Sequence, residues 1–108
     1  MRSDKVTNRG LAAPRLSVDQ FLGTIDDANT ANVNFLKTDL ETALTFSRMA
    51  LETSDPVKKN RTTRAARRAY DTITRLRRNV HPRQADADFL KKNLGLLKSD
   101  LLRLGESV

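Results

Sequence analysis

Apolar and small residues recur at every third or fourth position along most of this chain. Between residues 32 and 53 the members of the repeat are Val33, Leu36, Leu40, Ala43, Ser47 and Ala50. Residues 56–80 carry a second repeat, made of Thr62, Ala66, Ala69, Ile73, Leu76 and Val80. Residues 84–104 carry a third, made of Ala87, Leu90, Leu94, Leu97, Leu101 and Leu104. Steps of three and four place each set on one face of an α-helix, and the sustained alternation is typical of helices that pack lengthwise.

Short breaks separate the three repeats. Asp55 is a suitable N-cap and Pro56 suits the first turn of a helix. The residue before Pro82 is disfavoured in the α conformation, and Gly105 is suited to ending a helix. Because short connections place successive helices side by side, we expect an all-α fold, an antiparallel three-helix bundle with up-down-up topology. Its long helices are expected at about 32–53, 56–80 and 84–104.

A short extra helix is expected before the first long one. Ser17 and Gln20 have the spacing of a capping box, which predicts a helix over about 17–28. The polar stretch 26–30 is expected to end it. The bundle would therefore span residues 17–105, preceded by a flexible basic arm over 1–16 and followed by a tail over 106–108.

Composition excludes several classes of protein. The chain has 108 residues, no Cys, one His, four Gly and three Pro. A disulfide framework and a thiolate metal site are therefore excluded, and an all-β domain would need more turn residues. No apolar run is long enough to span a membrane, and the first fifteen residues lack the apolar core of a secretory signal. We expect a cytoplasmic protein with no membrane partner and no cofactor.

Charge is the strongest functional signal in the sequence. The net charge is +7, and residues 56–83 alone hold ten basic residues against one acid, a net +9. Helical spacing places most of these arginines opposite the apolar repeat. The candidate binding residues for a partner or for phosphate are Arg61, Arg64, Arg67, Arg68, Arg75 and Arg78.

Three interpretations of this arginine stripe are open. The leading one is a protein-interaction module that binds an acidic partner, because arginine is suited to bidentate carboxylate contacts. The alternative is sequence-independent binding of a nucleic-acid backbone through residues 58–78. In that case Arg2, Lys5, Arg9 and Arg15 of the arm would contribute. The third is a solvated face without a partner.

Apolar side chains offer a second surface for contact. Phe35, Phe46 and Met49 lie beside the first long repeat rather than within it. They would cover the short N-terminal helix or contact an outside partner. Self-association is a further expectation, since long helical bundles with regular apolar repeats often pair.

No pattern with a committed chemistry is present, and we expect no enzymatic activity. His81 lies at a helix end just before Pro82. A histidine at a helix C-terminus is stabilised by the helix dipole, and this explains its presence there without a catalytic role. The sequence has no Glu-x-x-His motif, which excludes the di-metal site of helical bundles, and no Gly-rich phosphate loop. We therefore expect neither a metal site nor catalytic residues.

The chain bears two resemblances to known helical proteins. The segment 32–80 is similar to the helical hairpins of tetratricopeptide and microtubule-interacting-and-trafficking domains, although its helices are longer and its spacing departs from the tetratricopeptide pattern. That similarity is carried by Ala43, Phe46, Ala50, Ala66, Tyr70 and Ile73. The stretch 67–72, with Leu97-Lys98 and Leu104-Gly105-Glu106, resembles small all-α bacterial proteins of unknown function. Both resemblances imply a helical fold, and neither transfers an activity to this chain.

Overall fold

The computed structural model describes residues 18–108, with side chains from Asp27 onward. It contains three α-helices, α1 (Val18–Glu52), α2 (Pro56–Leu76) and α3 (Gln84–Arg103), and a 3-10 turn η1 (Arg77–Asn79) after α2. No strand occurs in this part of the chain. The prediction of an all-α fold with three helices in contact is confirmed.

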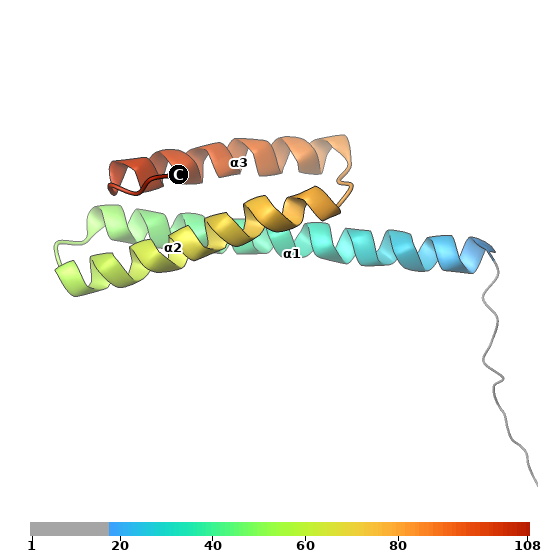
Figure 1. The fold of residues 1–108 in the computed structure, drawn as a ribbon, viewed down its shortest axis with the longest axis horizontal. Helices are drawn as coiled ribbons and strands as arrows, with labels where there is room; N and C mark the ends of the chain where they lie inside the picture. The colour runs from blue at the N-terminus through green and yellow to red at the C-terminus, as the bar shows by residue number, and fades with distance from the viewer. Residues whose placement is uncertain (1–17) are drawn as a thin grey trace, which may run out of the picture.

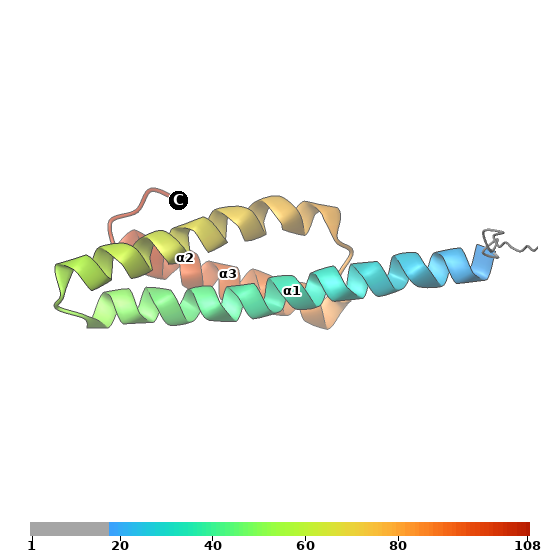
Figure 2. The ribbon, with the colours of Figure 1, turned by 90° about the horizontal axis from the view of Figure 1, so that it is seen from below.

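The helices lie alongside one another along only part of α1. Residues 53–55 connect α1 to α2 at one end of the molecule, and residues 80–83 connect η1 to α3 at the other (Figure 1). Both α2 and α3 pack against the C-terminal part of α1. The N-terminal turns of α1 extend past both of them, as two perpendicular views show (Figures 1 and 2).

The N-terminal region differs from the expectation of a separate short helix. The segments expected as helices 17–28 and 32–53 form one continuous helix, α1. The stretch 26–30 between them contains Asp, Ala, Asn and Thr but neither Gly nor Pro. These residues lower helix propensity by only a fraction of a kilocalorie each, roughly up to 0.7 kcal/mol, and the long helix tolerates them. The expected basic arm, residues 1–16, lies outside the described residues.

The core is built from the three apolar repeats. In α1 all six members of the repeat are buried, and Leu40 and Ala43 have no exposed surface. In the second repeat only Ala69 and Leu76 are half-buried and the other members are buried. In the third repeat the four central leucines are buried, and Ala87 and Leu104 at its ends are half-buried. Complete burial of a leucine side chain stabilises a fold by about 1.5–3 kcal/mol, so these repeats supply most of the packing free energy.

Local hydrogen bonds fix where α2 and α3 begin and end. The Asp55 carboxylate accepts hydrogen bonds from the backbone N–H groups of Val57 (3.0 Å) and Lys58 (3.4 Å) at the start of α2. The expected helix 56–80 ends earlier, because η1 tightens the chain after Leu76. After α3, Gly105 has a φ of 88°, a left-handed conformation that favours glycine.

A buried polar contact connects α1 to α3. The Ser47 hydroxyl donates to Oδ2 of Asp100 at 2.7 Å, and both side chains are buried. Arg48 Nε also approaches this oxygen, at 3.4 Å, and Arg103 lies 3.9 Å from the other carboxylate oxygen. A buried carboxylate without partners is costly, so these contacts select one register of α3 along α1.

Candidate interaction surface

The structure places five of the six predicted arginines along one exposed face, four of them on α2 and Arg78 on the η1 turn that follows it. All five are exposed, and they lie on the side of α2 opposite the buried Thr62, Ala66 and Ile73. At a rise of 1.5 Å per residue the row is about 25 Å long. We call this set the arginine face; it consists of Arg61, Arg64, Arg68, Arg75 and Arg78.

The sixth predicted residue, Arg67, is held by contacts within the chain. Its Nε donates to both carboxylate oxygens of Asp71, at 3.1 Å each. Its Nη1 lies 3.2 Å from Oε1 of Glu106, which follows α3. The Asp71 carboxylate, with a smaller effect from Glu106, raises the pKa of the Arg67 guanidinium above its ordinary value. Arg67 therefore ties α2 to the C-terminal segment.

Charge on the arginine face is not compensated by neighbouring acids. Among side chains 27–108, none of the five arginines forms an ion pair. The acid within the stripe, Asp71, is bound to Arg67. Asp39, Glu41 and Glu52 of α1 form no ion pair with these arginines over the same residues. Repulsion between arginines three or four positions apart costs about 0.2–0.5 kcal/mol per pair at low salt.

The three predicted apolar contact residues differ in accessibility. Phe35 is 56% exposed, whereas Phe46 and Met49 are half-buried, and Phe46 packs against the core. Phe35 lines a hollow of about 230 Å³ between α1 and the end of α2. The other residues of this hollow are Asn32, Leu36, Leu76, Asn79 and Val80. Of the three, Phe35 is therefore the one most available to a partner.

Several exposed apolar side chains were not predicted from the sequence. Val57, at the start of α2, is 68% exposed, and Leu96 and Leu102 of α3 are also exposed. Val57 lies four positions before Arg61, and this spacing places it on the same side of α2 as the arginine face. The spacing can be read from the sequence. The identity of an apolar residue in the first turn of a helix does not indicate whether its side chain is buried or exposed.

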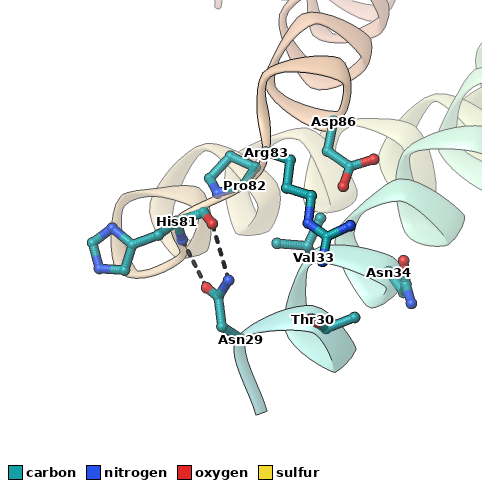
Figure 3. A pocket seen from close by; sticks show the side chains of 8 residues that line it. All are labelled: Asn29, Thr30, Val33, Asn34, His81, Pro82, Arg83 and Asp86. Atoms are coloured by element: carbon teal, nitrogen blue, oxygen red, sulfur yellow. Dashed lines mark hydrogen bonds between the residues drawn. The ribbon is translucent and has the colours of Figure 1, made fainter. Parts of the chain in front are cut away.

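A second hollow, with polar walls, lies where the 80–83 connection meets α1 (Figure 3). Its volume is about 250 Å³. The Asn29 side chain donates to the backbone carbonyl of His81 at 2.9 Å and accepts from its N–H at 2.7 Å. The imidazole of His81 points away from the hollow (Figure 3). Asp86 is paired with Lys37 at 2.8 Å. Several polar groups here thus hold the connection in place.

The described residues carry no cluster of three or more His, Cys, Asp or Glu side chains that could hold a metal ion. None of the helices over residues 18–108 combines the length and the apolar character needed to cross a membrane. No protein-family model, curated protein or solved structure matches this chain. The arginine face and the hollow beside Phe35 are therefore interpreted from their own geometry.

Proposed function

We propose that this up-down-up helical bundle is a non-enzymatic interaction module whose arginine face binds an acidic partner protein. The observation that carries the proposal is a row of five exposed arginines without an ion pair among side chains 27–108. An acidic partner supplies the carboxylates that the bundle lacks along this row, and it removes the repulsion between neighbouring arginines.

The spacing of the row suits a rod-shaped acidic surface. From Arg61 to Arg78 the positions step by three, four, seven and three, which keeps the arginines on one line along α2 and into the η1 turn. An acidic helix that packs alongside α2 would contact the arginines over the whole length of the row. Exposed ion pairs contribute only about 0.2–1 kcal/mol each, so several must form together for useful affinity.

The alternative function is sequence-independent binding of a nucleic-acid backbone through residues 58–78. It is favoured by the same observation, since arginine also contacts phosphate in a bidentate manner. Binding of this kind weakens steeply with salt, with a slope of about −0.9 per phosphate contact in duplex DNA. Base stacking is not supported, because the arginine face contains no aromatic side chain among its members.

Two matched triple variants test the proposal. In the first, Arg64→Glu, Arg68→Glu and Arg75→Glu reverse the centre of the arginine face. In the second, Lys91→Glu, Lys92→Glu and Lys98→Glu make the same change of net charge at three exposed positions of α3. Tagged protein is used to capture partners from lysate, with and without nuclease, and each captured protein is purified and titrated directly.

The proposal expects an acidic protein that survives nuclease, binds directly, and is lost in the arginine variant but kept in the lysine variant. Recovery of nucleic acid alone, again lost only in the arginine variant, would replace the proposal with its alternative. Equal loss in both triple variants would show a general effect of net charge and would overturn both functions. The same holds if the arginine variant keeps every partner.

A further inference from the structure

An apolar hollow rimmed by arginines lies at the end of the bundle where η1 follows α2 and α3 begins (Figure 1). Its volume is about 230 Å³. Pro82 of the connection and Ala87 and Leu90 of α3 supply its apolar walls, and Arg77 and Arg78 of η1 complete the lining. Hydrocarbon walls beside two guanidinium groups suit a ligand that is itself both apolar and acidic.

The two arginines of this hollow are available to acidic groups. Both are exposed, and neither forms an ion pair among side chains 27–108. Arg78 is also the last member of the arginine face, so the hollow and the arginine face share a residue. One acidic partner can therefore occupy the arginine face and this hollow together.

The opposite end of the arginine face also carries an apolar side chain. Val57 is 68% exposed and lies four positions before Arg61. At a rise of 1.5 Å per residue, Val57 and Arg78 are about 30 Å apart along the helix. The exposed arginines thus lie between two apolar contact points, Val57 at one end and the hollow at the other.

The repeat of the arginine face favours a helix over an extended chain as the ligand. Positions three and four apart along α2 return to the same side once per turn, about every 5.4 Å. Acids spaced in the same way on a second helix repeat at the same distance. Side chains on one side of an extended strand repeat every second residue, at about 6.6 Å. A helix therefore keeps its carboxylates in step with the arginines along the row.

An acid interrupts the row and disfavours a uniform polyanion. Asp71 lies three positions after Arg68 and four before Arg75, and its side chain is 55% exposed. A nucleic-acid backbone carries a negative charge on every nucleotide and brings one past Asp71. A helix can place a neutral residue at that point, which avoids the contact between like charges. The row therefore favours a ligand whose acids are spaced individually.

We propose that the acidic partner of the arginine face is an amphipathic helix, which lies along α2 and places an apolar side chain in the hollow between η1 and α3. The inference rests on the proposed function and adds the structure of the partner and its apolar contact. Exposed ion pairs contribute little affinity each, so the carboxylates orient the helix and the buried side chain supplies the tighter contact.

Two pairs of synthetic peptides test the inference on the unaltered chain. All are helical and carry Glu at positions three and four apart. Within a pair the peptides differ at one terminal position, Leu in one and Ala in the other, and the second pair has this exchange at the opposite terminus, because a helix can lie along α2 in either direction. Fluorescence anisotropy measures their affinities. The Leu peptide of one pair should bind about fivefold or more tightly than its Ala counterpart, because a larger apolar side chain is buried.

A filled hollow locates the effect. Ala87→Phe places a ring in the hollow, and the advantage of Leu over Ala should then fall below about twofold. Ala87→Leu makes the same test with a smaller side chain. Ala85→Phe is the matched control: Ala85 is exposed on α3 and is not among the residues that line the hollow, so the advantage should stay. Circular dichroism of each variant checks that the bundle is folded.

The outcomes separate this inference from the proposed function. Equal binding of Leu and Ala peptides in both pairs, lost in the Arg64→Glu, Arg68→Glu, Arg75→Glu variant, would overturn the apolar contact and leave the acidic partner in place. An advantage of Leu that persists when Ala87 is enlarged, or that Ala85→Phe reduces equally, would do the same. The helix would be overturned if a central Pro, which breaks it, left the affinity of the Leu peptide unchanged. Binding of no peptide would overturn both proposals.

Discussion

Arg67 on α2 and Glu106 after α3 form an ion pair across the bundle, with Nη1 and Oε1 at 3.2 Å. The same guanidinium binds both oxygens of Asp71 at 3.1 Å. Arg68, the next residue, is exposed and forms no ion pair among side chains 27–108. Two adjacent arginines on one helix therefore have different roles, the first in holding the bundle and the second in presenting charge.

This difference predicts opposite effects of two single substitutions. Arg67→Ala removes the contacts to Asp71 and Glu106 and should lower the melting temperature. Arg68→Ala removes one charge from a repelling row and should leave the melting temperature unchanged or raise it at low salt. Thermal unfolding followed by circular dichroism compares the two variants. An equal decrease in both would contradict the assignment of Arg67 to the structure of the bundle.

Repulsion along the arginine face makes a second prediction. Arg64→Glu replaces unfavourable neighbours by favourable ones, with Arg61 and Arg68 at three and four positions away. Each such pair is worth about 0.2–0.5 kcal/mol, so the free energy of unfolding should rise by several tenths of a kilocalorie at low salt. The gain should shrink at high salt, where the charges are screened. Urea unfolding at two salt concentrations measures it, and a loss of stability would contradict the account.

The buried contact between Ser47 and Asp100 makes a third prediction. Ser47→Ala leaves the Asp100 carboxylate buried without its closest donor, and the free energy of unfolding should fall by about 1–3 kcal/mol. Combining it with Asp100→Ala should cost less than the two single changes added together, with a coupling of roughly 0.5–3 kcal/mol. Urea unfolding of the four proteins completes this cycle. Simple additivity would mean that the contact does not stabilise the packing of α3 on α1.

The N-cap of α2 makes a fourth prediction. Asp55→Ala removes the acceptor for the N–H groups of Val57 and Lys58 and should cost about 1 kcal/mol. Ser54→Ala, at the neighbouring exposed position, is the control and should change the unfolding free energy little. Because this cap lies at the junction of α1 and α2, the loss of stability is measured by chemical denaturation of the whole bundle.

The sequence predicted the helical class and the buried faces because both depend on local periodicity. Leu36, Ile73 and Leu97 are buried as their spacing indicates. The break expected at 26–30 was wrong because unfavourable propensities alone do not end a helix that lacks Gly or Pro at that point. The long reach of α1 beyond the bundle was therefore not predicted.

The contacts that arrange the site could not be predicted from spacing. Asn29 and His81 are 52 residues apart, and Ser47 and Asp100 are 53 apart. Their pairing depends on the register of helices that only the folded structure fixes. The same is true of Arg67. Its spacing in the sequence does not distinguish it from the five exposed arginines, but its partner Glu106 lies beyond the end of α3.

The most direct test of the central claim is the affinity of the full chain for a helical peptide rich in Glu, measured by fluorescence anisotropy against a DNA duplex of equal charge. The account predicts that the peptide binds more tightly than the duplex at the same salt concentration. It also predicts that the Arg64→Glu, Arg68→Glu, Arg75→Glu variant loses the peptide while the Lys91→Glu, Lys92→Glu, Lys98→Glu variant keeps it. Tighter binding of the duplex, or equal loss in both variants, would contradict the claim that the arginine face binds an acidic protein.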